Sequence, residues 1–286
     1  MTGTKIVKLR LEDGQAGKLP NLKDSAVDQA LKLYKEMPWV VQTQYYNDTL
    51  EHSRRLNLNQ NQVQALVNAM EEGPPKDSNY AGSAGLFLSA MVQGSTNKCF
   101  ELATKVPLSY LGYRLEGDKT LIVEGDVEDR LGYGMKSGRI IVKGSARDWV
   151  GGMMTGGDIL IEKDARDFVG GTMEGGNILV KGDSRQAPGF NMADGKIIID
   201  GSCAELAGRG MRNGFLHVKG NAGIWAAKWL IGGKVRIDGN VGAEAALKMS
   251  GGVLEIGGSM EGLSPEKTGG TVFYKGRQIW PVETTR

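Results

Sequence analysis

A 19-residue period in the second half of the chain constrains the fold more than any other feature of the sequence. Glycine opens successive units at Gly125, Gly144, Gly182, Gly201, Gly220, Gly239 and Gly258, and Lys163 fills the one missing place. Ten places later each unit carries a large apolar residue, at Met135, Met154, Met173, Met192, Met211, Leu230 and Met249. Seven units keep this spacing without an insertion, which indicates a repeat architecture.

Each unit also contains one short segment in which apolar residues alternate with others, such as RIIVKG, DILIEK and NILVKG. A period of two with β-branched residues is typical of a β-strand. A 19-residue unit is shorter than the roughly 30 residues that a βαβ crossover needs, so each coil is expected to return and stack its strand on the previous one. We therefore predict a parallel β-helix over residues 111–276, with a last strand at Thr271 to Gly276 and a C-terminal tail over 277–286.

In a stack of coils, equivalent positions form columns, and every column has one environment. The first and third apolar residues of each strand are expected to point inward, and the methionine column is interpreted as core filling rather than as a metal or redox stripe. Cys203 shares its column with small residues such as Ala146 and Ala165. It is expected to be a small buried residue and not a nucleophile.

The central residue of each strand should point out of the coil. That column begins with five aliphatic residues, Ile122, Ile141, Leu160, Leu179 and Ile198, and continues with His217, Arg236 and Glu255. Leaving five adjacent aliphatic side chains exposed to water is unfavourable, because burying each one would contribute about 1.5–3 kcal/mol to stability. We predict that these five are covered, either by the N-terminal region of the chain or by a partner subunit. His217 is interpreted as a surface or interface residue.

A second column is charged. Arg147, Arg166 and Arg185 are in register, next to Asp129, Asp148 and Asp167. One interpretation is a self-compensating ladder, in which the aspartates neutralise the stacked arginines. The other is a groove for an anionic carrier tail, with Arg185 the freest because Gln186 replaces the expected aspartate. The neighbouring Trp149 and Phe168 either stack on each other or belong to a partner surface.

Residues 1–110 lack the repeat and are predicted to be mainly helical with a short initial strand at Lys5 to Leu11. A helix should follow Ser25 and end before Pro38, and Asn59 to Gln62 should form a capping box for a second helix. A further helix is predicted for NKCFELAT, and the small, apolar stretch YAGSAGLFLSAMVQ should pack on the β-helix. The pair Pro74-Pro75 is the expected hinge.

Composition narrows the function classes. Lysine and arginine number 35 against 33 acidic residues, a net charge of +2, which argues against strong binding to nucleic acid or an anionic membrane. Two cysteines and two histidines are too few for a soft-metal site in this chain. With no signal-peptide core and no long apolar run, we expect a cytoplasmic protein.

The units GDVEDRLGYGMKSGRIIVKG, SARDWVGGMMTGGDILIEK and DARDFVGGTMEGGNILVKG resemble the GXGXG β-helix family over about residues 115–262. Members of this family include the C-terminal domain of the glutamate synthase large subunit and the β-helix subunit of formylmethanofuran dehydrogenase and related formyltransferase/hydrolase complexes. The resemblance implies a right-handed parallel β-helix that acts as a structural spacer, with the chemistry in other domains or subunits. The order of the KIVKLRL start, a helical stretch and the repeats is similar to that of the formylmethanofuran dehydrogenase subunit.

Three functional expectations follow. The first is a non-catalytic scaffold subunit of a cytoplasmic complex like formylmethanofuran dehydrogenase or formyltransferase/hydrolase, in one-carbon metabolism. It would hold no cofactor itself, and molybdopterin, another metal group or a flavin would belong to partner subunits. The second is a β-helix subunit of a glutamate-synthase-like complex, linking amidotransferase and flavin subunits. The third is an enzyme with a site between the N-terminal helices and the first coils.

Overall fold

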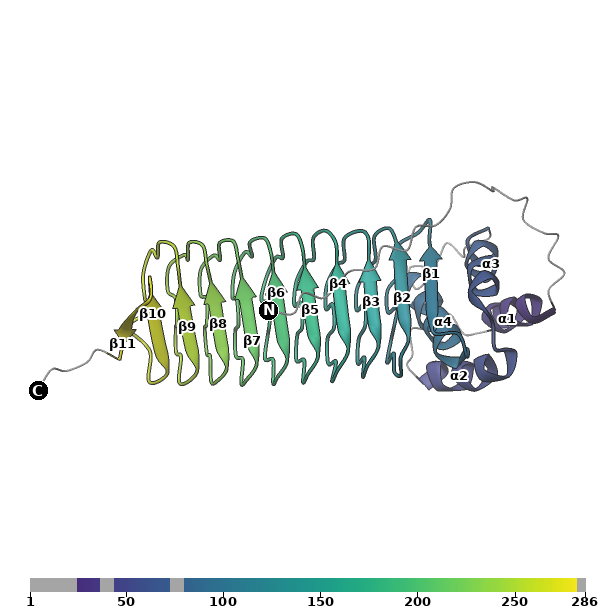
Figure 1. The fold of residues 1–286 in the computed structure, drawn as a ribbon, viewed down its shortest axis with the longest axis horizontal. Coiled ribbons are helices and arrows are strands. Elements are labelled where there is room, and N and C mark those ends of the chain that lie inside the picture. Colours follow the sequence, from purple (N-terminus) through teal and green to yellow (C-terminus); the bar gives the residue numbers. More distant parts are fainter. Residues whose placement is uncertain (1–24, 37–43, 73–79, 282–286) are drawn as a thin grey trace, which may run out of the picture.

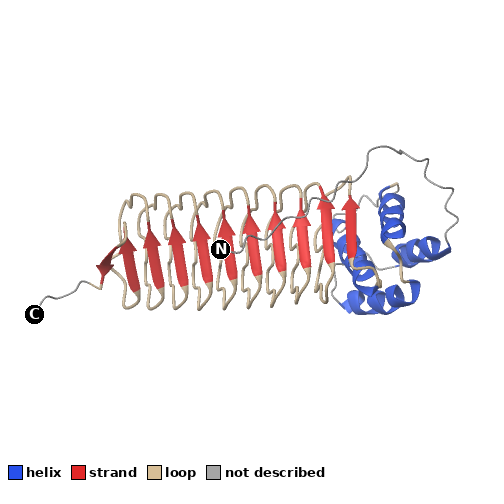
Figure 2. Ribbon diagram, in the orientation of Figure 1, coloured by secondary structure: helices blue, strands red, loops and turns tan. Residues whose placement is uncertain are grey.

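The computed structural model describes residues 25–36, 44–72 and 80–281, and it shows a helical region followed by a parallel β-solenoid. Strands β1 to β11 lie side by side in chain order in one sheet along a long body, with the helices gathered at the β1 end (Figure 1). Loops close each coil behind the sheet (Figure 2). The predicted fold class, a parallel β-helix of 19-residue coils after a helical region, is confirmed.

The described helices are α1 (Ser25–Glu36), α2 (Gln44–Leu56), α3 (Gln60–Glu71) and α4 (Tyr80–Gly94). The helix predicted after Ser25 is confirmed as α1, which buries Val27, Ala30 and Tyr34 on one face. The capping box is confirmed too, since Asn59 accepts from the backbone of Gln62 and the Gln62 side chain accepts in return. The predicted initial strand and the Pro74-Pro75 hinge lie outside the described residues.

Helix α4 fastens the helical region to the solenoid. Nearly every residue from Tyr80 to Val92 is buried, as expected for a helix that is apolar all round. A Cβ on Gly85 would overlap the carbonyl oxygen of Ser109, so the small residue permits close backbone approach. Ser89 Oγ also donates to the carbonyl of Tyr110 over 2.9 Å. The predicted packing of this segment on the β-helix is therefore confirmed. Among the described residues, no helix is long and apolar enough to cross a membrane.

The strands keep the 19-residue register almost throughout. They are β1 (Cys99–Ala103), β2 (Thr120–Glu124), β3 (Arg139–Val142), β4 (Asp158–Ile161), β5 (Asn177–Val180), β6 (Lys196–Ile199), β7 (Phe215–Val218), β8 (Lys234–Ile237), β9 (Val253–Ile256), β10 (Thr271–Tyr274) and β11 (Arg277–Trp280). Neighbours pair in parallel, for example Ile141 with Leu160, and only β10 and β11 pair antiparallel. The predicted last strand at Thr271 is confirmed, and β11 lies inside the range assigned to the C-terminal tail.

The predicted third helix, NKCFELAT, is wrong: Cys99–Ala103 is strand β1, and the sheet begins inside the range 1–110 that was assigned to the helical region. Its residues alternate between exposed and buried, with Phe100 and Leu102 inside. Cys99 pairs with Thr120, an offset of 21 residues rather than 19. The tertiary pairing with β2 therefore decides the conformation over the helix preference of Glu, Leu and Ala.

The methionine column fills the solenoid core, as predicted. Met135, Met154, Met173, Met192, Met211 and Met249 are all fully buried. Most of them reach toward the next coil: a Cβ added at Gly176, for example, would lie 2.6 Å from the Cε of Met154. Gly176 also has φ +90°, so glycine is required there both for the turn and for the methionine beneath it.

A ladder of short polar side chains fixes one turn of successive coils. Asp164 Oδ1 accepts the backbone N–H of Asp183 over 2.9 Å, and Asp183 Oδ1 accepts that of Ser202 over 2.7 Å. The ladder continues through Asn221 and Asn240 in the later coils. These side chains satisfy backbone donors that the strands do not reach, so the turn repeats as regularly as the sheet.

Helix α3 covers the open edge of the sheet with two glutamines. Gln60 donates to the carbonyl of Glu101 over 2.6 Å and accepts from its N–H over 2.9 Å. One helical turn later, Gln64 makes the same two bonds with Ala103, at 2.9 Å each. The two amides thus replace the strand that would precede β1, and they protect an edge that could otherwise pair with another chain.

Replacing both glutamines by alanine should expose this edge. Four backbone groups of β1 would lose their partners, at a cost of about 1 kcal/mol each. We expect a lower melting temperature and concentration-dependent aggregation, measured by light scattering during heating. Gln29→Ala on the exposed side of α1 is the matched control. Unchanged melting and scattering in the double variant would show that the two glutamines do not protect the edge.

Candidate docking site

The outward column of β2 to β6 forms a continuous apolar strip, here called the aliphatic face. Its members are the five predicted interface residues, Ile122, Ile141, Leu160, Leu179 and Ile198. All five are half-buried, while the strand residues on either side of them point into the core. The strip borders a shallow hollow of about 310 Å³, which Arg139, Asp158 and Lys196 also line.

The described helices do not cover this face. They are gathered around β1, against which α3 packs, and none lies over β3 to β6 (Figure 1). The sequence predicted that either the N-terminal region or a partner subunit covers this face, and residues 1–24 of the N-terminal region lie outside the described residues. A half-buried row of aliphatic side chains, flanked by charged residues, is the kind of patch that marks a protein interaction site.

The positive charges of the arginine column are not neutralised by the neighbouring aspartates, although one interpretation of the sequence expected this. Arg147 pairs with Glu128 at 2.9 Å, and Glu128 occupies the same column one coil earlier. Within the described part of the chain, Arg166 and Arg185 form no ion pair, and both are exposed. The three arginines therefore share a column, and only the first of them is neutralised by a carboxylate.

The aspartates next to this column serve the backbone. Asp129 Oδ1 accepts the N–H of Asp148 over 3.2 Å, and Asp148 Oδ1 accepts that of Asp167 over 3.2 Å. Asp167 Oδ1 accepts the N–H of Gln186 over 3.0 Å. They form a second ladder between coils, so their positions are explained by folding and not by the arginines.

A hollow of about 330 Å³ lies at the start of the arginine column. Arg147 and Arg166 line it, together with the carboxylates of Asp126, Glu128 and Asp164. Three acids beside two arginines make this hollow a poor site for an anion. Arg185 lies outside it, which leaves Arg185 as the arginine best suited to an anionic ligand.

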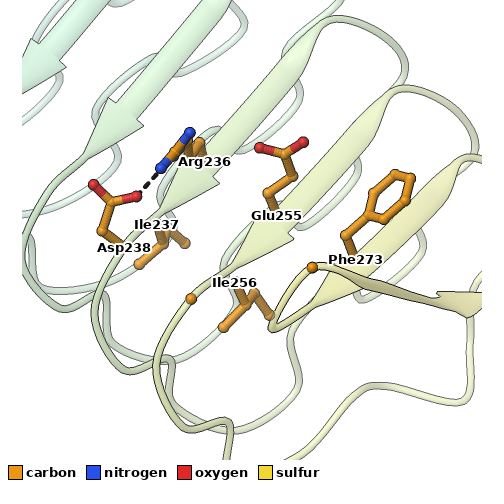
Figure 3. A pocket seen from close by; sticks show the side chains of 8 residues that line it. Arg236, Ile237, Asp238, Glu255, Ile256 and Phe273 are labelled. Carbon is orange, nitrogen blue, oxygen red and sulfur yellow. Dashed lines mark hydrogen bonds and ion pairs between the residues drawn. The ribbon is translucent and has the colours of Figure 1, made fainter.

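Toward the C-terminal end the outward column becomes polar. Arg236, Glu255 and Phe273 come from neighbouring strands β8, β9 and β10 and line a hollow of about 370 Å³ (Figure 3). Arg236 Nε donates to Asp238 over 2.7 Å, and His217 Nε2 lies 2.7 Å from the other oxygen of that carboxylate. Burial alone would raise the pKa of Asp238, but these two hydrogen bonds outweigh it and hold the pKa below its ordinary value. His217 is thus engaged in a hydrogen-bonded cluster with Asp238 and Arg236.

Aromatic rings follow one corner of the coils, away from the strands. Trp149 and Phe168 stack with centroids 4.9 Å apart, which confirms the stacking interpretation. Phe190 meets Phe168 edge-on at 5.5 Å. Farther along, the Arg209 guanidinium lies 4.6 Å from the ring centre of Trp229. Trp149, Phe168 and Phe190 pack on one another, so we assign these three rings to stability.

The two cysteines differ sharply in environment. Cys203 is 6% exposed, and burial, with a smaller contribution from the charge of Asp183, raises its pKa to about 12. Cys99 is exposed at the first position of β1. The prediction that Cys203 is a small buried residue is confirmed.

Alkylation should therefore modify one thiol. With iodoacetamide at pH 8, mass spectrometry of the folded chain should show complete labelling of Cys99 and almost none of Cys203, because only a thiolate reacts. In denaturant both should react. Equal labelling rates in the folded chain would contradict the burial of this column.

The junction between the helices and the first coil is the region of the third functional expectation. Phe87 of α4 and Phe100 of β1 are fully buried there. Lys119 Nζ donates to the carbonyl of Asn97 over 2.7 Å, and desolvation lowers its pKa. Phe87, Phe100 and Lys119 thus pack or bind the backbone. No group of three or more metal-ligating side chains occurs among the residues described.

Comparison with known proteins adds no relative: no family model and no curated protein matches this chain. The class is thus defined by the fold itself, a parallel β-solenoid with a helical cap and an aliphatic face on its sheet.

Proposed function

We propose that this chain is a non-catalytic scaffold subunit of a multi-subunit enzyme complex in the cytoplasm, and that the aliphatic face is its docking surface. The observation that carries the proposal is the row of five half-buried aliphatic side chains on β2 to β6, which the described helices leave uncovered. A regular stack of coils is rigid and long, which suits a spacer that holds other proteins at fixed positions.

The resemblance to the GXGXG β-helix family supports a complex of the formylmethanofuran dehydrogenase or formyltransferase/hydrolase type, in one-carbon metabolism. Partner subunits would then carry the molybdopterin or other metal group. A glutamate-synthase-like complex, with amidotransferase and flavin subunits, is the alternative within the same scaffold role. In the first case Arg185 is the residue we propose to contact the anionic tail of a carrier.

Leu160→Asp tests the docking role. The variant places a carboxylate in the middle of the aliphatic face, where desolvating it on docking would cost several kcal/mol. We expect the tagged variant, expressed in the native host, to lose the subunits that the wild type co-purifies, with a loss of only about 1 kcal/mol in the free energy of unfolding. Mass spectrometry identifies those subunits: amidohydrolase and molybdenum- or tungsten-type subunits support the first complex, flavin and amidotransferase subunits the second.

Glu174→Asp is the matched control, because this side chain is exposed and lies in a loop outside the strands that form the face. If Leu160→Asp retains every partner of the wild type, the aliphatic face is not the docking surface. An enzymatically active chain that purifies without any partner would contradict the scaffold role itself.

A further inference from the structure

Two rows of charged residues border the aliphatic face, one along each end of the strands. At the start of β3, β4 and β6 stand Arg139, Asp158 and Lys196, with the neutral Asn177 between the last two. After the strand core the order is Glu124, Lys143, Glu162, Lys181 and Asp200. The second row alternates in sign from coil to coil, whereas the first changes sign between β3 and β4 and is neutral at β5. Neighbours pair within the chain, as in Arg139–Asp158 at 3.4 Å and Lys181–Glu162 at 3.8 Å.

Alternating charge makes such a face complementary to itself in only one orientation. A second copy that faces it with aligned strands is related by a two-fold axis along either the solenoid or the strands. With the axis along the solenoid, each strand meets the reversed copy of itself. Arg139 would then oppose the partner's Lys143, and Asp158 the partner's Glu162, so that like charges meet.

With the axis along the strands, the solenoids run antiparallel and equal ends of the strands meet. If this axis passes between β3 and β4, Arg139 opposes the partner's Asp158. Lys143 likewise opposes the partner's Glu162, and Glu124 the partner's Lys181. In the apolar strip, Ile141 meets the partner's Leu160, and Ile122 meets the partner's Leu179. Shifting the axis to pass through β4 places Asp158 against the partner's Asp158. An axis between β4 and β5 also matches four aliphatic side chains, but it places Arg139 against the partner's Lys196. The charges therefore favour the register with the axis between β3 and β4.

We propose that the aliphatic face binds a second copy of this chain, in a dimer whose two-fold axis runs along the strands between β3 and β4. The inference rests on the proposed docking role of this face and names its occupant. Four of the five aliphatic side chains are then matched by aliphatic side chains, and every charge that these four strands place opposite a charge has the opposite sign. The other subunits of the complex would bind surfaces that only this dimer presents, so a variant that breaks the dimer also loses those subunits.

Glu124 and Lys181 allow a test of the dimer, because these two side chains can meet only between two copies of the chain. They belong to β2 and β5, three strand spacings or about 14 Å apart, so they do not meet in one molecule. Both are exposed. In the proposed dimer Glu124 of each copy faces Lys181 of the other copy, so the two-fold symmetry produces this contact twice. Glu124→Lys alone, or Lys181→Glu alone, would therefore create two like-charge contacts, and the double variant would restore two opposite-charge contacts.

The experiment is sedimentation velocity of the purified full chain over a concentration series at low salt. We expect a monomer–dimer equilibrium whose Kd rises about 10-fold in each single variant and returns to within about 3-fold of wild type in the double variant. Glu174→Lys, an exposed reversal away from the face, is the control and should leave Kd unchanged. Equal weakening in the double variant and the singles would overturn the proposed register.

The outcome also separates this inference from the proposed function. A wild-type chain that stays monomeric while Leu160→Asp loses identified subunits from the native complex overturns the dimer and leaves the docking role in place. A monomeric wild type whose Leu160→Asp variant keeps all its subunits overturns both.

Discussion

Deleting residues 163–181, one whole coil, is expected to leave a folded solenoid, whereas deleting only residues 163–172 should unfold the coils that follow. The larger deletion joins two complete coils in the same register. Strand β4 would then pair with β6, placing Ile159 on Ile197 and Leu160 on Ile198, and every later side chain keeps its column. Asp148 would accept the N–H of Gln186 as it now accepts that of Asp167.

The smaller deletion leaves about half a coil, which is too short to return to the sheet. Strand β5 would lose its place beside β4, and the hydrogen bonds and apolar contacts across that step would be lost. Circular dichroism and urea unfolding measure the difference. We expect one cooperative transition with strand signal for the 19-residue deletion, and loss of roughly half the strand signal for the other. Equal damage by both deletions would contradict the independence of the coils.

The second large effect distinguishes the two sides of a single strand. Ile178 and Leu179 are neighbours in β5, and Ile178 is 1% exposed in the core whereas Leu179 is half-buried on the aliphatic face. Ile178→Asp places a carboxylate among apolar side chains without a partner, which should cost at least about 4 kcal/mol. Because domains are stable by only about 5–15 kcal/mol, this variant should be largely unfolded or insoluble.

Leu179→Asp carries the same chemical change one residue later. Its carboxylate reaches water, so we expect a loss of about 1 kcal/mol in the free energy of unfolding, measured by urea titration. The pair is its own control, since propensity and charge are the same in both variants. Similar stabilities would show that the inward and outward assignments of β5 are wrong.

The solenoid was predictable because every coil places the same kinds of residue at the same positions, and so repeats the same packing. Met154 and Gly176 must occur together, since the methionine fills the space that a side chain on the next coil would need. Residues 19 positions apart therefore share one environment, buried or exposed, and the sequence shows this environment in seven successive units. The first strand shows where this fails: Cys99 is 21 residues before its partner Thr120, so β1 falls outside the period and resembles a helix.

The helical region was predictable only where a local signal existed. Asn59 and Gln62 predict the start of α3, because both hydrogen bonds of the capping box form within four residues. Helix α2 carries few apolar residues, and its buried face includes the polar Thr49 and Ser53, so the hydrophobic period that predicts a helix is weak. Its place is set by packing against α4.

For the candidate site, the sequence identified the aliphatic face but not the contacts of the charged residues. Arg147 pairs with Glu128, which extending the arginine column by one coil would have suggested. The use of Gln60 and Gln64 as a substitute strand joins residues about 40 positions apart, and no local pattern predicts it. Contacts between coils follow from the period, and contacts between the helices and the sheet do not.

The most direct test of the docking account is the accessibility of Leu160 in the isolated chain and in the native assembly. In a Cys99→Ser background, Leu160→Cys supplies one reactive thiol on the aliphatic face, since Cys203 is buried. The account predicts fast labelling by a maleimide in the dilute isolated chain and at least about 10-fold slower labelling in the purified assembly. Equal labelling rates in the two samples would show that nothing docks on this face, and the proposed scaffold surface would be wrong.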